Sequence, residues 1–195
     1  MDSLHLIYKY YPEENSLRNL LVHHSRQVRD RALHILDAHP ELEADRDFVA
    51  RAAMLHDVGV FLTDAPGIYC HGTYPYLMHG YLGGRLMREE GLPEIARVCE
   101  RHTGTGLTAA MIKEAGLPLP PGDYCPETLE EQLVCYADKF YSKSHPLRVR
   151  TIAQTAQALA KYGSEGVRKF WQWVQKFEPE YAPPMPQITQ NKCNP

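Results

Sequence analysis

A histidine and an aspartate stand side by side at the end of an apolar helical run, and this pair constrains the fold more than any other feature of the chain. Val49, Ala52, Ala53 and His56 are spaced three, one and three residues apart, so they share one helix face and the imidazole points inward. A buried, unpaired Asp57 beside it would be costly, so a cation or a hydrogen-bond network must meet it. Taken alone, the pair also fits an ordinary helix end with a solvated aspartate.

The segment around this pair is expected to end one helix and begin a loop. We expect the helix to cover about residues 44–57, with Gly59 in the left-handed conformation as its C-terminal cap. Residues 60–76 mix proline and glycine with aromatic side chains, which predicts a long irregular loop. Loops of that length are uncommon unless functional. Tyr69, Tyr74 and Tyr76 either line a pocket there or hold the loop in place.

Length and charge exclude several classes of protein. A chain of 195 residues is long enough for one well-buried domain. The net charge of −3 gives no broad basic field, which argues against binding to nucleic acid polymers or anionic membranes. There is neither a membrane-spanning apolar run nor a signal-peptide pattern, so we expect a cytoplasmic protein. Five cysteines without a Cys-x-x-Cys pair indicate neither a disulfide framework nor a thiolate zinc site.

Apolar residues recur with helical period along most of the chain, which predicts an all-α fold. Besides the helix at 44–57, we expect helices at about residues 14–38, 77–90, 93–102, 107–115, 127–142, 147–162 and 164–177, after a short segment at 2–11 that is either helical or extended. The proline-rich residues 179–195 are expected to form a loosely held tail after a single domain over residues 1–178.

Several of these helices carry a polar side chain on their apolar face. His24, and not its neighbour His23, falls in the stripe from Leu21 to Val28, and His102 repeats the spacing seen at His56. The inward set contains six residues, namely His24, His56, Asp57, His79, His102 and Asp138. Single core histidines bonded to backbone, or a salt bridge between Asp138 and Lys139, are the simpler alternatives.

Together these six groups favour a metal centre. Six polar side chains aimed into a core would be a large desolvation cost unless they met one another or a cation. Imidazole and carboxylate ligands without thiolate suit divalent iron, manganese, zinc, cobalt or nickel, and helix bundles are a known way to project such ligands into one centre.

The order of these residues resembles the HD superfamily of metal-dependent phosphohydrolases. The matching segments are His24-Ser25-x-x-Val28, Leu55-His56-Asp57-Val58-Gly59, Met78-His79-Gly80-Tyr81-Leu82-Gly83, Arg101-His102-Thr103-Gly104 and Tyr136-Ala137-Asp138-Lys139. The layout is most similar to bacterial HD-type hydrolases of diadenosine tetraphosphate. One difference is that Val60, Phe61 and Leu62 are apolar, where those enzymes tend to carry a basic residue.

The resemblance implies a compact HD bundle of about six to eight helices and a metal-bound hydroxide that attacks phosphorus. Asp57 would bridge two ions, Asp57 and His56 would be catalytic, and His79 and His102 would belong to the second ion. The expected substrate is a small phosphorylated molecule, in the first place a nucleotide. Candidate phosphate contacts are Lys139, Arg85, Arg101 and His145.

Two other functions stay open at this point. A mononuclear nucleotidase would use only His24, His56, Asp57 and Asp138. A non-hydrolytic module that binds a nucleotide or a metal as a signal is the third possibility. The complete ligand set disfavours it, because a protein without catalysis has little reason to keep six costly buried groups.

Overall fold

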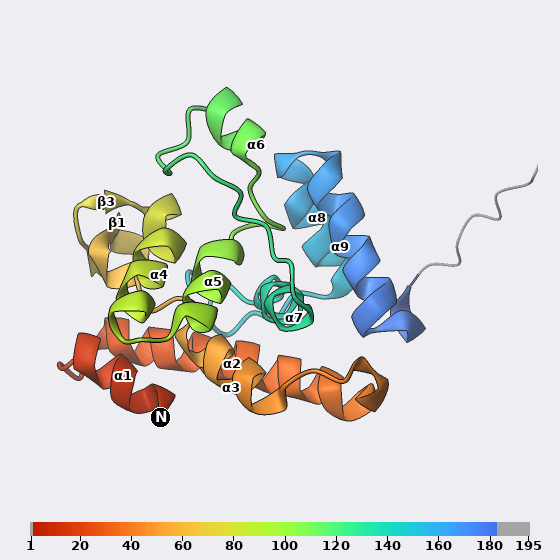
Figure 1. The fold of residues 1–195 in the computed structure, drawn as a ribbon, viewed down its shortest axis with the longest axis horizontal. Coiled ribbons are helices and arrows are strands. Elements are labelled where there is room, and N and C mark those ends of the chain that lie inside the picture. The colour runs from red at the N-terminus through yellow and green to blue at the C-terminus, as the bar shows by residue number, and fades with distance from the viewer. Residues whose placement is uncertain (1, 183–195) are drawn as a thin grey trace, which may run out of the picture.

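The longest helix among the described residues lies at the base of the molecule and packs mainly against α3 and α7. The structure is a computed structural model that describes residues 2–182. Helix α2 (Ser16–Ala38) begins where the Asn15 side chain accepts a hydrogen bond from the Arg18 backbone N–H, and it ends before Pro40, which cannot continue a helix. Its apolar face is buried, and it packs along α3 at the base of the molecule (Figure 1).

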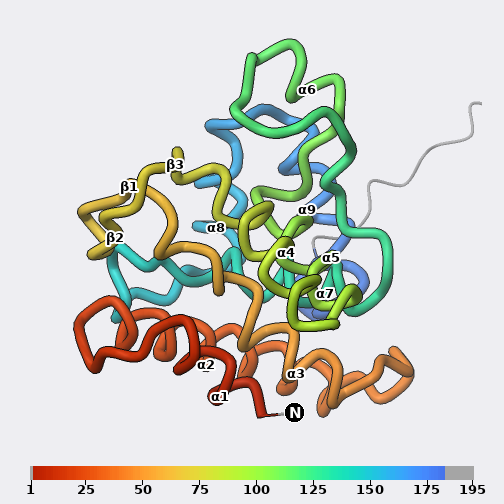
Figure 2. Tube along the Cα trace, turned by 60° about the vertical axis from the view of Figure 1, so that its left-hand side comes forward, coloured from red at the N-terminus to blue at the C-terminus, as the bar shows by residue number. Residues whose placement is uncertain are grey.

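The all-α prediction is confirmed. The described residues form nine α-helices, one more than the upper bound of eight, because the segment at 2–11, which could have been extended, forms the helix α1. The helices are α1 (Ser3–Tyr10), α2 (Ser16–Ala38), α3 (Arg46–Leu55), α4 (His79–Glu89), α5 (Pro93–Arg101), α6 (Ala109–Glu114), α7 (Leu129–Asp138), α8 (Ile152–Leu159) and α9 (Ser164–Phe177). In both views of the backbone α6 projects from the body at the tip of a long connection (Figures 1 and 2).

The segment after α3 differs from the prediction. The helix ends at Leu55, so His56 and Asp57 lie just beyond it. Gly59 is not a left-handed cap, since its φ is −84° and the chain continues into a right-handed turn at Val60–Leu62. The glycine is needed for a different reason: a Cβ at this position would lie 2.4 Å from the backbone oxygen of His79 and 2.4 Å from the backbone nitrogen of Gly83. The absence of a side chain thus lets α4 pack directly on this turn.

Residues 60–76 were expected to form an irregular loop, but part of this segment forms a small β-sheet. They contain three short strands, β1 (Thr63–Ala65), β2 (Cys70–His71) and β3 (Tyr74–Pro75), in the order β2-β1-β3. Strand β1 pairs antiparallel with β2 and parallel with β3. The small sheet lies at one end of the molecule, beside α4 (Figure 2). Strands of two or three residues carry too little side-chain periodicity to be seen in a sequence dominated by proline and glycine.

Helix α7 is shorter than predicted. It begins with a capping box, in which Thr128 and Glu131 bond each other's backbone N–H groups, but it ends at Asp138 and not at Ser142. Tight turns follow, and the Arg150 backbone N–H donates to the Phe140 carbonyl at 2.9 Å. Residues 141–149 therefore form a closed loop instead of helix, and α8 begins only at Ile152.

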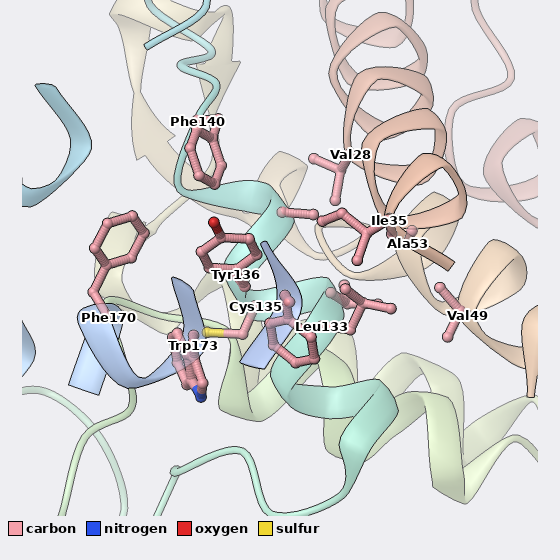
Figure 3. Packing of buried hydrophobic residues seen from close by; sticks show 14 of the residues in the cluster. Val28, Ile35, Val49, Ala53, Leu133, Cys135, Tyr136, Phe140, Phe170 and Trp173 are labelled. Atoms are coloured by element: carbon pink, nitrogen blue, oxygen red, sulfur yellow. The ribbon is translucent and has the colours of Figure 1, made fainter. Parts of the chain in front are cut away.

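Two apolar clusters make up the core. One is built from α1, the first half of α2, the end of α3, α4 and α5. The other joins the second half of α2 and the start of α3 to α7, α8 and α9, with Tyr136 at its centre (Figure 3). The Tyr136 ring lies 5.0 Å from the ring of Phe140, 5.5 Å from that of Phe170 and 5.4 Å from that of Phe177. The elements that carry the polar centre described below pack in one or both of these clusters.

Two further expectations concern the C-terminal tail and membrane-spanning helices. Of the predicted tail at 179–195, residues 183–195 lie outside the described part, and Pro179–Tyr181 form a single 3-10 turn. Among the helices in residues 2–182, none combines the length and the apolar character needed to cross a bilayer.

Candidate metal centre

The six side chains expected to face inward come together from five helices, and five of the six lie at or just beyond a helix end. His24 lies in the middle of α2, His79 is the first residue of α4, and Asp138 is the last residue of α7. His56 directly follows α3 and His102 directly follows α5, which explains their identical apolar spacing. All six are buried or nearly so, and Asp57 and His56 have no exposed surface.

Four of these residues form a first donor group. The His24 Nε2 atom lies 3.1 Å from Oδ2 of Asp57 and 3.0 Å from Oδ1 of Asp138. The His56 Nε2 atom lies 3.1 Å from the same Asp57 oxygen and 3.6 Å from the same Asp138 oxygen. One ion at the middle of these atoms could be bound by two imidazoles and two carboxylates.

A second group uses the other oxygen of Asp57. Its Oδ1 atom lies 3.4 Å from Nε2 of His79 and 3.4 Å from Nε2 of His102. Within each group the donor atoms all lie within 4.8 Å of one another. The carboxylate of Asp57 therefore faces both groups, which is the arrangement expected for a ligand that bridges two ions.

Hydrogen bonds fix the orientation of three imidazoles. The Nδ1 atoms of His56, His79 and His102 each lie 2.7 Å from the carbonyl three residues earlier in the chain. A carbonyl only accepts, so each Nδ1 must donate, and in the neutral ring Nε2 is left as a bare lone pair. This is how metal-binding histidines are commonly held.

Without a cation, the acceptor atoms of the second group face one another with no hydrogen-bond donor between them. The Nε2 atoms of His79 and His102 lie 3.0 Å apart, and in neutral rings with protonated Nδ1 both are acceptors. Burial lowers the pKa of His79 to about 3 and also lowers the pKa of His102, so neither ring supplies a proton at neutral pH. Oδ1 of Asp57 and Nε2 of His56 are buried and make no hydrogen bond within the described residues. The donor set thus fits divalent metal ions.

The two carboxylates are held in the charged form. Burial alone would raise the pKa of Asp57, but the charges of Lys143 and His56 hold it well below its usual value. Burial would also raise the pKa of Asp138, but the Lys139 ammonium and the nearby rings of His24 and His56 hold it well below its usual value. Both aspartates are therefore ionised at neutral pH, as metal ligands must be.

Sequence reasoning missed Lys143. Its ammonium contacts Oδ2 of Asp57 and lies 3.4 Å from Nε2 of His24, and its pKa is raised because the carboxylates outweigh its burial. The positive charge near the His-Asp pair thus comes from the loop after α7 and not from residues 60–62. The predicted helix to Ser142 left Lys143 outside any pattern, and the spacing of four residues from Lys139 was the only available signal.

The four proposed phosphate contacts are placed very differently. Lys139 is close to the centre, but its Nζ donates to Oδ2 of Asp138 at 2.8 Å and to the His102 carbonyl at 2.8 Å. Arg101 donates to the Cys125 carbonyl and pairs with Glu127 at 2.7 Å. Arg85 and His145 are exposed on the surface. Only Lys139 lines the hollow next to the centre.

This hollow has a volume of about 450 Å³ and opens beside Asp138. Most of its lining comes from the loop after α7, and Tyr76 contributes the opposite side. The Tyr76 ring is stacked on the imidazole of His79, with 4.6 Å between ring centres. Tyr69 and Tyr74 are exposed and do not line the hollow, so of the three loop tyrosines only Tyr76 is in a position to touch a molecule bound there.

Several curated proteins are similar to this chain in sequence. The chain is 29% identical over 154 residues to a tRNA (cytidine(56)-2'-O)-methyltransferase of Picrophilus torridus, covering 74% of this chain and 40% of the relative. The corresponding methyltransferase of Thermoplasma volcanium is 29% identical over 150 residues, with 76% and 38% covered. An uncharacterised protein of Methanocaldococcus jannaschii is 40% identical over 97 residues, 49% of this chain and 50% of that protein. The chain thus spans half or less of the length of these curated relatives.

Among solved structures, the HD domain of the Listeria monocytogenes phosphodiesterase PgpH has a TM-score of 0.49 and 16% identity, covering 87% of this chain and 100% of that domain. The same domain in complex with cyclic-di-AMP has a TM-score of 0.48 and 17% identity, with 86% and 94% covered. The sequence model of the HD domain matches residues 21–142, a span that contains all six donor residues and more than half of the chain. The protein therefore belongs to the HD domain family.

Proposed function

We propose that this protein is a metal-dependent phosphohydrolase that acts on a nucleotide or another small phosphorylated molecule, with dinucleoside polyphosphates among the candidates. The observation that supports this most strongly is Asp57, whose two oxygens face two separate groups of donor atoms next to a hollow with cationic walls. Membership of the HD domain family supports the same assignment.

The roles of the residues follow from their contacts. His24, His56, Asp57 and Asp138 would hold one ion, and Asp57, His79 and His102 a second. Two divalent ions at these positions would lower the pKa of a water molecule toward neutrality and offset the charge on phosphoryl oxygens. His56 and Asp57, the buried pair, would keep this centre in place beside the substrate. Residues 1–178 would act as one domain.

Lys143 would have an electrostatic role. Its side chain is 11% exposed and reaches the border between the donor groups and the hollow. An ammonium at this border can shift from Asp57 to a phosphoryl oxygen of the substrate without leaving its position in the loop. Lys139 would instead keep Asp138 in orientation, because it bonds both that carboxylate and the His102 carbonyl.

The test is a screen of anaerobically purified, metal-replete protein against phosphomonoesters, cyclic nucleotides and dinucleoside polyphosphates. A tRNA sample belongs in the screen because the names of two relatives mention tRNA. We expect metal-dependent phosphate release or bond cleavage with a small compound. Preference for tRNA over every small compound would contradict the substrate part of the proposal.

Asp57→Ala is the matching variant, and it is expected to abolish this activity because it removes the ligand shared by both groups. Asp64→Ala is the control, since Asp64 is an exposed aspartate on the neighbouring strand β1. Full activity in purified Asp57→Ala protein would reject the centre. Loss of activity in both variants would mean that the effect comes from a general change in fold.

A further inference from the structure

The hollow beside the metal centre is lined by three cationic side chains, and these differ in how their charge is balanced. They are Lys139, Lys143 and Arg150, all from the stretch that follows α7. The Lys143 ammonium is paired with Asp57, and the Lys139 ammonium with Asp138. Both lysines thus already have a carboxylate partner in the protein.

Arg150 has no such partner among residues 2–182. Its guanidinium makes one hydrogen bond there, from Nη1 to the Lys139 carbonyl at 3.3 Å, and no described carboxylate forms an ion pair with it. Other arginines with shielded side chains, such as Arg31 and Arg101, do form ion pairs. A half-buried guanidinium that faces a hollow without an acidic neighbour is suited to an anion from solution.

The backbone holds Arg150 in place at this wall. Its N–H donates to the Phe140 carbonyl at 2.9 Å, and Phe140 is fully buried against Tyr136. The next residue, Thr151, caps α8. The guanidinium is therefore anchored between two rigid elements, and the carbonyl that it contacts belongs to the residue after Asp138. The guanidinium thus lines the same hollow as Asp138, a member of the first donor group.

We propose that Arg150 binds a second phosphoryl group of the substrate, so that the preferred substrate carries at least two linked phosphates. This inference rests on the proposed function for the position of the attacked phosphorus, which lies at the two donor groups. A single phosphoryl group at that position would be bound by the metal centre and Lys143. The N–H donors of the Arg150 guanidinium would then have no phosphoryl oxygen to bind. A neighbouring phosphoryl group in the hollow can accept two parallel N–H bonds from it.

Calorimetric binding of inorganic pyrophosphate and inorganic phosphate to metal-loaded, desalted protein tests the proposal. We expect wild type to bind pyrophosphate at least about tenfold more tightly, since one more charge-assisted contact is formed. Arg150→Gln should weaken pyrophosphate binding by about 10- to 100-fold and change phosphate binding by less than about threefold. Arg150→Lys keeps the positive charge but cannot donate two parallel N–H bonds. Its affinity for pyrophosphate should therefore lie between those of wild type and Arg150→Gln.

Arg148→Gln is the matched control, because Arg148 is exposed on the same loop and does not line the hollow. It makes the same charge change and should leave the ratio of the two affinities as in wild type. Equal effects of Arg150→Gln on both anions, or no effect on either, would overturn the proposal.

The binding experiment needs no turnover, so its failure can be told apart from failure of the proposed function. If small phosphorylated compounds are hydrolysed but Arg150→Gln leaves the pyrophosphate preference intact, only the second phosphate site is wrong. If no such compound is hydrolysed but the preference depends on Arg150, the hydrolase assignment fails and the anion site stands.

Discussion

Gly59→Ala is predicted to lower both the stability of the protein and its affinity for metal, although Gly59 contributes no ligand. A Cβ at this position would lie 2.4 Å from the backbone oxygen of His79, whereas ordinary contacts begin at 3.4 Å. The backbone nitrogen of Gly83 would be equally close, at 2.4 Å. Because both neighbours are backbone atoms, neither can rotate away as a side chain would. The turn after α3 and the start of α4 must therefore move apart by about 1 Å, in an interior that is packed as densely as a crystal.

The expected cost can be worked out from this contact. Overpacking of a rigid site costs about 1–3 kcal/mol, and two backbone atoms place Gly59→Ala at the upper end. Replacing glycine by alanine restricts the unfolded chain and returns about 0.4–1 kcal/mol. The free energy of unfolding should thus fall by about 2 kcal/mol, which lowers Tm by about 4–8 °C for a chain of this size.

Metal binding should respond as well, because His79 is the first residue of α4. Metal sites tolerate deviations of only about 0.2 Å in ligand distance, far less than the displacement required here. Thermal unfolding with and without metal, together with metal analysis, measures both effects. Gly67→Ala is the control: nothing lies within 4 Å of its added Cβ, so it should leave Tm unchanged or raise it. A Gly59→Ala protein that melts within about 1 °C of wild type and keeps its full metal content would refute this reasoning.

Three further predictions concern the centre itself. Metal-replete wild type should bind two ions per chain and the His79→Ala and His102→Ala proteins about one, as measured by elemental analysis, while His23→Ala, which changes a histidine outside both donor groups, should keep two; a wild type that never exceeds one ion would contradict this. In the metal-free protein burial lowers the pKa of His56, but Asp57 and Asp138 outweigh it and raise the pKa to about 9, so the ring is charged at neutral pH and must lose a proton when it binds metal. Calorimetry in buffers of different ionisation enthalpy should therefore detect proton release at pH 7, with metal affinity rising by up to about tenfold per pH unit until about pH 9, and an affinity independent of pH in that range would argue against it. Tyr76→Ala should raise KM more than it lowers kcat, because the side chain lines the hollow, whereas Tyr76→Phe keeps the ring and should stay near wild type; equal KM values in all three proteins would exclude a role of the ring in binding.

Much of the centre could be predicted because helical periodicity reports directly on which side chains face inward. The identical spacing before His56 and before His102 predicted two inward imidazoles, and the structure places both directly after helices and within the same cluster. The choice of His24 over His23 followed from the same argument and is confirmed by its burial.

The remaining parts depend on contacts between distant segments, which periodicity does not report. Gly59 was assigned to a helix cap from local preference, but its actual constraint is the close approach of α4. Lys143 meets Asp57 only because the chain turns sharply after Asp138, whereas the apolar pattern predicted four more residues of helix. Arg150 likewise reaches the hollow because its backbone N–H bonds the Phe140 carbonyl across the loop of residues 141–149.

The donor residues come from both sides of the divided core. His79 and His102 belong to elements packed in the first apolar cluster, whereas Asp138 ends a helix packed in the second. Bound ions would therefore fasten the two halves of the molecule to each other, and at a free concentration one hundred times Kd an ion adds about 2.7 kcal/mol to the free energy of unfolding. Since cellular proteases degrade the opened forms of a protein, the amount of this protein in a cell would then follow the supply of its metal.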